Sequence, residues 1–132
     1  MPSERTLVIV DAANVVGSVP DGWWRDRRAA TERLRDALVP LASAGLPGHP
    51  GPVELVLVVE GRARGVASVP GVLVDPAPDS GDDRIAELAG AAADRVCVVV
   101  TADRELRRRV EEHGARCVGP RTVRPAPPAG TP

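Results

Sequence analysis

Residues 6–14 read TLVIVDAAN, and the way this stretch ends decides how the rest of the chain is interpreted. Its first part, Thr6–Val10, is an unbroken β-forming run, as expected for a central parallel strand that is covered on both faces. Asp11 follows directly, and Asn14 comes three residues later. Asp and Asn also favour turns, so the meaning of this ending depends on how the other strands end.

Similar β-type runs alternate with helix-type segments along the rest of the chain. Four more strands are expected at residues 53–60 (VELVLVVE), 72–75 (VLVD), 96–101 (VCVVVT) and 115–119 (ARCVG). The helical spacing of apolar residues predicts helices at 30–41, 82–93 and 103–113. Such alternation predicts an α/β fold with a parallel sheet and helices on both faces, because right-handed crossovers place them there.

Three segments are expected to bend, connect or end these elements. Pro40 should kink or end the first helix, because proline lacks the N–H that a helix needs. The segment GLPGHPGP at 45–52 should be a connection. The Pro-rich residues 121–132 should be disordered or extended, which leaves 1–120 as a single domain.

The composition excludes several classes of function. Of the 132 residues, 43% are hydrophobic and 27% are charged, which is typical of one globular domain. The net charge of −1 gives no overall attraction to nucleic acid, so any such binding has to come from a local patch. All 17 basic residues are arginine, which indicates a GC-rich bacterial coding bias of the actinobacterial kind. It also excludes mechanisms that need a lysine Schiff base or a P-loop lysine.

The cysteines and the N-terminus favour a cytoplasmic protein. Cys97 and Cys117 lie in strand-like runs without CxxC spacing, so we expect buried, reduced thiols. The opening MPSERT has no apolar signal region, and no run is long enough to span a membrane. We therefore expect a cytoplasmic location and no membrane partner.

The predicted strands share a chemical feature at their ends. Acidic residues end or closely follow four of them, at Asp11, Glu60, Asp75 and Asp103. In open α/β sheets the carboxyl ends of the strands face the ligand crevice, so these side chains should meet on one rim. Asp82 and Asp83 open a helix after a glycine and should point to the same edge.

Part of this acidic rim has a structural explanation. Helix capping can account for Asp82, Asp83 and Asp103, and a turn can account for Asp75. Asp11 and Glu60 follow uninterrupted apolar runs, which capping and turns do not explain. Clustered carboxylates repel one another unless a cation or a proton intervenes. Because oxygen ligands suit Mg²⁺ or Mn²⁺, we favour a metal site over coincidence.

Residues that would bind a nucleic acid surround this rim in the sequence. Trp23 and Trp24 are the only aromatic residues and offer a stacking surface for a base, although a pair packed under the first helix is an equal alternative. Arginines near them and after the other strands would hold phosphates. The substrate-binding candidates are Trp23, Trp24, Arg25, Arg28, Arg62, Arg64, Thr101 and Arg104.

Together these motifs resemble the NYN/PIN-like ribonuclease superfamily. The segments that carry the resemblance are VIVDAANVV, LVLVVEG, SGDDRIAELA, VCVVVTADRELRRRV and GARCVGP, which together extend from Thr6 to Pro120. The resemblance implies a three-layer α/β/α sandwich with a five-stranded parallel sheet in the order 3-2-1-4-5. It also implies hydrolysis of RNA phosphodiester bonds with Mg²⁺ or Mn²⁺.

The resemblance also implies a role for each residue of the rim. Asp11 is the central metal ligand, and Asn14 orients the metal shell or the substrate. Asp103 supplies a further carboxylate, and Glu60 fits an acidic position after the second strand. Either Asp82 or Asp83 supplies another carboxylate; we favour Asp83, with Asp82 as a cap. The catalytic set is therefore Asp11, Asn14, Asp83 and Asp103.

Two departures from the family pattern bear on the substrate. Ala13 stands where the family usually has an aromatic residue, and the chain is short, with little room for a substrate-binding insertion. The protein would then need a second copy of itself or a partner protein, or it would act on small nucleotides.

Other functions compete with the ribonuclease. A metal-dependent hydrolase of small nucleotides would use the same carboxylates, and a catalytically silent module of this type would bind RNA or a protein. A receiver domain is excluded, because it requires a lysine after the fifth strand. Neither GxGxxG, nor GxxxxGK[ST], nor GxSxG is present, so dinucleotide, P-loop and covalent hydrolase chemistry are unsupported.

Overall fold

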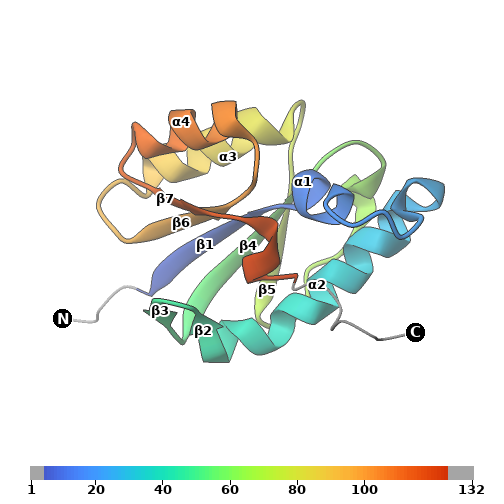
Figure 1. The fold of residues 1–132 in the computed structure, drawn as a ribbon, viewed down its shortest axis with the longest axis horizontal. Coiled ribbons are helices and arrows are strands. Elements are labelled where there is room, and N and C mark those ends of the chain that lie inside the picture. Colours follow the sequence, from blue (N-terminus) through green and yellow to red (C-terminus); the bar gives the residue numbers. More distant parts are fainter. Residues whose placement is uncertain (1–4, 125–132) are drawn as a thin grey trace.

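The computed structural model describes residues 5–124, which form an α/β fold around a five-stranded parallel sheet (Figure 1). The strands lie in the order β5-β4-β1-β6-β7, with neighbours parallel throughout. Their bounds are Val72–Pro76, Val53–Val59, Thr6–Asp11, Cys97–Val100 and Arg116–Val118, in that spatial order. In chain order this is 3-2-1-4-5, so the expected topology is confirmed.

Helices cover both faces of this sheet. The helices are α1 (Ala12–Gly17), α2 (Arg27–Ala44), α3 (Gly81–Ala91) and α4 (Arg104–Glu111). Figure 1 shows α3 and α4 on one side of the sheet and α2 on the other, which is the three-layer arrangement. Single 3₁₀ turns occur at Trp23–Arg25, Gly61–Gly65 and Pro120–Thr122.

The central strand β1 divides its side chains between two hydrophobic cores. Val8 and Val10 pack with residues of α1 and α2, whereas Leu7 and Ile9 pack with residues of α3 and α4. This is the two-residue alternation of a strand, with apolar residues required on both faces because both are covered. The unbroken apolar run at the start of the chain therefore follows from the position of β1 at the centre of the sheet.

The structure differs from the sequence expectations in three local places. Pro40 does not end its helix, because α2 continues to Ala44 while Leu34 and Leu38 hold it against the core; tertiary packing here outweighs the local cost of proline. The connection at 45–52 contains a small antiparallel hairpin, β2 (Gly45–Leu46) with β3 (His49–Pro50). The short helix α1 was not expected.

The cysteines and the C-terminal segment also bear on the expectations. Cys97 is buried and Cys117 is half-buried, and both are free thiols; burial raises the pKa of the Cys97 thiol to about 11. The fold continues past the expected boundary at 120, because Val123 is buried and Arg124 makes hydrogen bonds. Residues 125–132 of the expected tail lie outside the described residues. Within 5–124, no helix is long and apolar enough to cross a membrane.

A matched pair of leucines tests the core. Leu57 of β4 is fully buried, whereas Leu73 of the neighbouring strand β5 is 54% exposed. We expect Leu57→Ala to lower the free energy of unfolding by about 2–5 kcal/mol, since it leaves a cavity, and Leu73→Ala to change it by less than about 0.5 kcal/mol. Urea unfolding followed by circular dichroism measures both. Equal losses would contradict the assignment of β4 to the interior.

Candidate active site

Asp11 is a buried carboxylate at the carboxyl end of β1. It is 4% exposed, and its Oδ2 accepts a hydrogen bond of 2.9 Å from the hydroxyl of Thr101. The strand register explains this contact, because Val10 pairs with Val100 and the next residue of each strand is therefore adjacent. Oδ1 accepts a long bond of 3.4 Å from the backbone N–H of Asn14, so Asp11 also caps α1.

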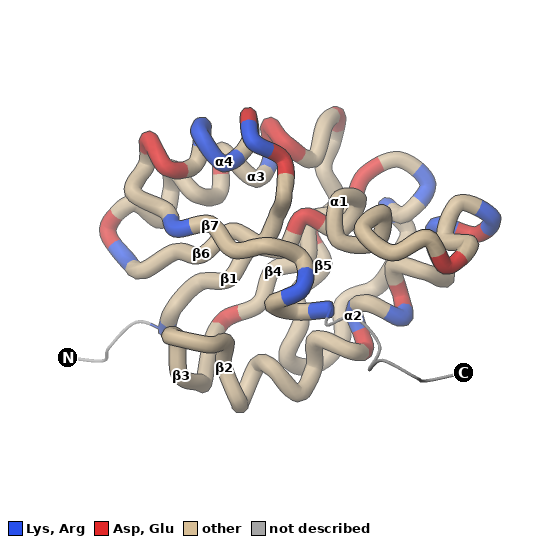
Figure 2. The backbone as a smooth tube through the Cα atoms, viewed as in Figure 1, with Lys and Arg blue, Asp and Glu red and all other residues tan. Residues whose placement is uncertain are grey.

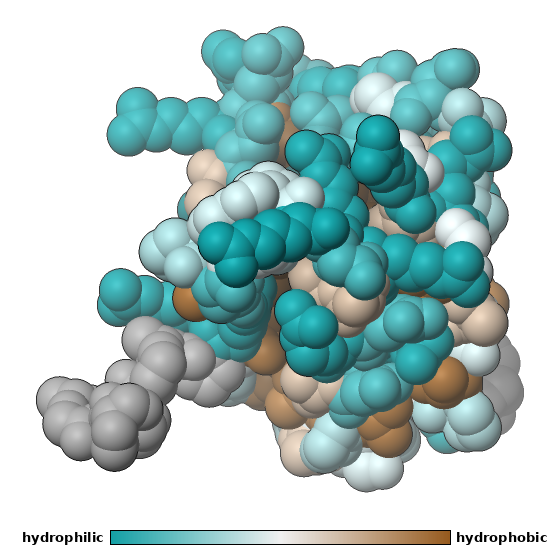
Figure 3. Space-filling model, turned by 90° about the vertical axis from the view of Figure 1, so that its right-hand side faces the viewer, coloured by the Kyte–Doolittle hydropathy of each residue, from teal (hydrophilic) through white to brown (hydrophobic). Residues whose placement is uncertain are grey.

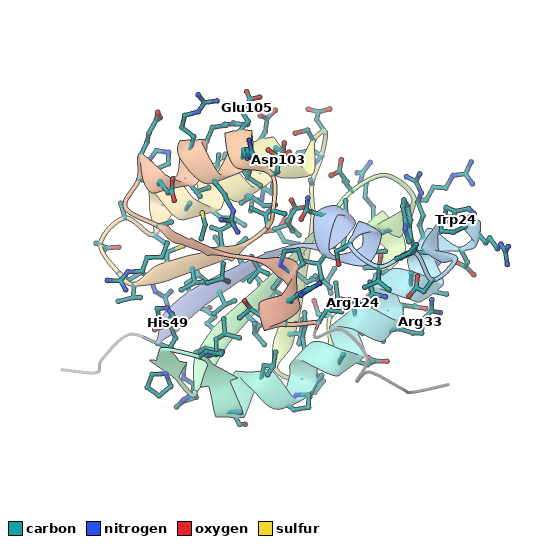
Figure 4. All side chains as sticks on the ribbon, in the orientation of Figure 1. Trp24, Arg33, His49, Asp103, Glu105 and Arg124 are labelled. Atoms are coloured by element: carbon teal, nitrogen blue, oxygen red, sulfur yellow. The ribbon has the colours of Figure 1, made fainter. Side chains whose placement is uncertain are left out.

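A hydrogen-bonded chain joins Asp11 to the start of α4. The Thr101 hydroxyl accepts a bond of 3.2 Å from the backbone N–H of Asp103, and Asp103 caps α4 by accepting from the N–H of Leu106 at 2.9 Å. The Asn14 side chain accepts from the N–H of Ala102 at 2.8 Å, which ties α1 to the same loop. Figure 4 shows Asp103 at the end of α4 that faces α1. Asp11, Asn14 and Asp103 are thus brought together.

The neighbours Asp82 and Asp83 at the start of α3 have different surroundings. The helix is capped by Ser80, whose hydroxyl accepts from the N–H of Asp83 at 3.1 Å, so the expected capping role of Asp82 is not found. The pKa of Asp82 is raised by partial burial and by the nearby charges of Asp103 and Glu60, and it is lowered by Arg109. The Asp83 side chain is 68% exposed and forms an ion pair with Arg109 at 3.0 Å.

Glu60 lies against the first turn of α3. It directly follows β4, and a Cβ atom at Gly81 would come within 2.7 Å of the Glu60 Oε1. Glycine at position 81 therefore leaves the space that the Glu60 carboxylate occupies beside Asp82. Its charge also contributes to raising the pKa of Asp11 and of Asp82.

Burial gives Asp11 an unusual proton affinity. The pKa of its carboxyl is raised from 3.8 to about 6, chiefly because burial disfavours the charged form. The hydrogen bonds from Thr101 and Asn14 lower it, and the charges of Asp82 and Glu60 raise it further. The rim therefore holds carboxylates that disfavour one another's ionisation, a condition that a cation or protons relieve.

The chemistry of these side chains suits a hard cation, although the ligands are not preassembled. Within residues 5–124, no three His, Cys, Asp or Glu side chains are arranged as a ready metal site. The oxygen atoms of Asp11, Asp82, Asp103 and Glu60 are nevertheless the donors that Mg²⁺ and Mn²⁺ take. Asp75 does not join them, because Arg84 binds its carboxylate at 2.9 Å.

The predicted substrate-binding residues separate into buried and exposed groups. Thr101 has no exposed surface and its hydroxyl serves Asp11, so a direct contact with substrate is not available to it. Trp24 is 53% exposed and lies at the outer edge of the molecule (Figure 4), whereas Trp23 packs against the core. Their rings meet edge to face at 5.9 Å.

The predicted arginines lie on three segments of the chain: the 3₁₀ turn after Glu60, the start of α4, and the region from Trp24 to the first turn of α2. Arg62 and Arg64 are exposed in the 3₁₀ turn after Glu60, and Arg104 is exposed at the start of α4. Arg25 lies 6.0 Å from the Trp24 ring, and the Arg28 guanidinium lies against Gly65. Figure 2 shows acidic and basic residues interspersed over α3, α4 and the loop before α2. Figure 3 views the side where β1 leads into α1, and this face is mainly hydrophilic.

Two arginines outside the predicted substrate-binding set support this arrangement. Arg107 donates to the carbonyl of Thr101 at 2.8 Å. Arg124 donates to the carbonyls of Val15 and Val16, at 3.2 and 2.9 Å, and so holds the end of α1. More than 100 residues separate Arg124 from α1 in the sequence, and no local pattern signals such a contact.

Comparison with known proteins adds to the description of the fold. No protein-family profile and no curated protein matches the sequence. The chain is similar in fold to Rae1 (YacP) from Bacillus subtilis. A crystal structure of Rae1 superposes with a TM-score of 0.73 at 18% identity, over 90% of this chain and 71% of Rae1. The crystal structure of the Rae1 W164L mutant superposes with a TM-score of 0.65 at 20% identity, over 89% of this chain and 70% of the mutant chain. At this low sequence identity the similarity to Rae1 shows the fold alone.

The raised pKa of Asp11 predicts how stability depends on pH. The folded state binds this proton more tightly than the unfolded state, so ionisation of Asp11 costs stability as the pH rises from about 4 to about 6. Asp11→Asn removes the penalty. Relative to the wild type, the free energy of unfolding of the variant should rise by on the order of 2–3 kcal/mol between pH 4 and pH 6. Above pH 6 the difference should stay constant.

Chemical unfolding in EDTA between pH 3.5 and 8 measures this difference. Chelation is needed because a bound cation would itself stabilise the ionised carboxylate. Asp83→Asn is the matched control, since its side chain is exposed. A difference between Asp11→Asn and the wild type that does not change with pH would contradict the raised pKa.

Proposed function

We propose that this protein is a metal-dependent ribonuclease that hydrolyses RNA phosphodiester bonds at the rim formed by Asp11, Asn14, Asp82, Asp103 and Glu60. The observation that carries the proposal is the buried Asp11, held by Thr101 and Asn14, whose pKa is raised partly by the neighbouring carboxylates. The motif resemblance in the sequence and the fold likeness to Rae1 both support it.

Some residues of the rim would bind a cation, and others would hold those ligands in position. Asp11, Asp82 and Asp103 would hold Mg²⁺ or Mn²⁺, with Glu60 beside them; when bound, such a cation activates water and stabilises charge on the phosphoryl group. Thr101 keeps Asp11 oriented through its 2.9 Å hydrogen bond. Asn14 fixes α1 to the loop that carries Asp103.

The exposed arginines would position the RNA strand. Arg62 and Arg64 follow Glu60, and Arg104 follows Asp103, so exposed positive charge comes directly after two of the rim carboxylates. Contacts of this kind bind phosphates without reading sequence, and the net charge of −1 makes a local patch necessary. Trp24, with its large exposed ring, offers a stacking surface for a base.

The surroundings of Asp82 favour it over Asp83 as the carboxylate from α3. Asp82 is partly buried near Asp103 and Glu60, whose charges raise its pKa, whereas the exposed Asp83 forms an ion pair with Arg109. This choice replaces our preference from sequence, and it is the most direct point at which the proposal can be tested, since the two residues are adjacent and chemically identical.

We expect metal-dependent cleavage of labelled single-stranded RNA that distinguishes these two aspartates. With Mn²⁺ or Mg²⁺, Asp11→Asn, Asp82→Asn and Asp103→Asn should each lose about 100-fold or more in rate, as when preorganised charge is removed from an active site. Asp83→Asn should stay within about threefold of the wild type, because exposed changes away from a site have small effects. EDTA should abolish cleavage.

Asparagine is chosen because its side-chain oxygen can still cap α4 at position 103 and can still accept from Thr101 at position 11. A loss of rate therefore reports the loss of the charge. Loss in Asp83→Asn with retention in Asp82→Asn would reverse the assignment. Cleavage that persists in EDTA would contradict metal dependence. No turnover in any protein would mean that the acidic strand ends are structural.

A hydrolase of small nucleotides is the second candidate, because a small pocket lies next to the rim and has Glu60 among its lining residues. It is lined by Ala12, Trp23, Arg27 and Glu60, among others, and has a volume of about 260 Å³. Nucleoside triphosphates assayed beside the RNA decide between the two: triphosphate turnover without RNA cleavage would favour this candidate. Assembly with a second copy or with a partner protein stays a prediction.

A further inference from the structure

A groove lies between the segment that leaves α1 and the segment that leaves β7. Its walls are residues 18–20 and residues 119–121, and Ala102 and Arg124 complete the lining. We call it the α1–β7 groove. Its volume is about 520 Å³, within the ~300–1,000 Å³ range of pockets that hold small ligands. The groove is therefore large enough to bind one unit of a polymer.

The α1–β7 groove meets the rim at the loop between β6 and α4. Ala102 lines the groove, and in the sequence it stands between Thr101, which binds Asp11, and Asp103. The Asn14 side chain accepts a hydrogen bond from the N–H of Ala102 at 2.8 Å, so the rim and the groove share this backbone. The groove therefore begins next to residues of the proposed active site.

Most polar groups along the walls are already hydrogen-bonded within the protein. The Ser18 hydroxyl donates to a carbonyl of α1 at 2.6 Å. The carbonyls of Val19 and Pro120 accept from the backbone N–H groups two and four residues later, at 2.9 and 2.8 Å. Pro20 and Pro120 have no N–H to donate. The walls therefore offer apolar contact but few groups that could read the edge of a base.

The charge of the groove is positive. Arg124 is half-buried and its guanidinium is already bound, because it donates to two carbonyls of α1 and pairs with Asp21 (Figure 4). Arg121 is exposed, and within residues 5–124 its side chain forms no ion pair. None of the described residues that line the groove is acidic. Arg121 is therefore available to bind a phosphate.

We infer that the α1–β7 groove binds one nucleotide of single-stranded RNA, next to the phosphate that lies at the rim. The base lies against Val19, Pro20 and Pro120, and the Arg121 guanidinium binds a phosphate of the same strand. Every base has an apolar face, and phosphate contacts carry no sequence information, so the groove accepts any base. The inference rests on the proposed function, because it takes the polymer at the rim to be RNA.

Charge and position favour RNA over a second copy of this chain as the occupant. The groove supplies a cation and apolar walls beside the proposed site, which is the combination that a single strand requires. A second copy has a net charge of only −1, and acidic and basic residues are interspersed over its helices (Figure 2). It therefore offers no concentrated negative charge to Arg121.

Two arginine variants of the full chain test the phosphate contact. Labelled oligouridylate and oligocytidylate are titrated in EDTA, which prevents metal-dependent cleavage, and fluorescence anisotropy gives the Kd at several salt concentrations. Arg121→Gln should raise the Kd of both RNAs by about threefold or more and lower the slope of log Kd against log salt by about 0.7, as for one lost phosphate contact. Arg116→Gln is the matched control.

The control removes the same charge at the other end of β7. Arg116 is the first residue of this strand, is exposed, and forms no ion pair within the described part of the chain. Arg116→Gln should change neither the Kd nor the slope appreciably. Equal effects of the two variants would show a general attraction between the protein and RNA, and would overturn the inference.

Cross-linking locates the base. Oligouridylate that carries 4-thiouracil is irradiated with the wild-type protein, and mass spectrometry maps the adducts. The adducts should lie within residues 18–20 and 119–121. Val19→Asp should remove them, because a carboxylate in the apolar wall repels the strand. Val39→Asp, a change at an exposed position of α2, is the matched control and should retain them.

The outcomes separate this inference from the proposed function. Adducts confined to other residues would overturn the groove, and metal-dependent RNA cleavage in the same protein would leave the ribonuclease standing. Adducts in the groove of a protein that cleaves no RNA would support the groove and overturn the ribonuclease. A dimer that Val19→Asp dissociates, with RNA binding unchanged, would assign the groove to a second copy and overturn the inference.

Discussion

The buried hydrogen bond from Thr101 to Asp11 is the interaction on which the arrangement of the rim depends. It joins the ends of two neighbouring parallel strands, β1 and β6, at the point where each leaves the sheet. The same hydroxyl accepts from the N–H of Asp103, and Asp103 begins α4. A single buried threonine therefore relates two acidic residues that lie 92 positions apart in the sequence. Its bond also moderates the cost of a buried charge, because it favours the ionised form of Asp11.

The start of α3 adds the third acidic side chain through a steric constraint. Gly81 leaves room for the Glu60 carboxylate, and the Ser80 cap and the buried Ile85 fix the rotation of the helix. Successive residues of a helix differ by about 100° in direction, so Asp82 faces the rim while Asp83 faces Arg109. The rim thus concentrates negative charge, which Arg109 offsets only in part and which the proposed cation would relieve.

Different parts of this structure were predictable for different physical reasons. Continuous apolar runs revealed the strands, and the rule that parallel strands end on one rim brought Asp11, Glu60 and Asp103 together before their positions were known. The strand order came from the resemblance of the motifs. Local sequence could not choose between Asp82 and Asp83, because helix rotation depends on tertiary packing. It also could not show that Asp75 binds Arg84, that Arg124 holds α1, or that Pro40 remains within a helix held by its buried face.

The most direct measurement is the titration of the Asp11 carboxyl followed by NMR of isotope-labelled aspartate, with Asp11→Asn to assign the signal. In EDTA the midpoint should lie at about 6, and added Mg²⁺ should lower it, because a bound cation favours the ionised carboxylate. A midpoint near the ordinary value of about 3.9, unchanged by Mg²⁺, would contradict a cation-binding rim centred on Asp11.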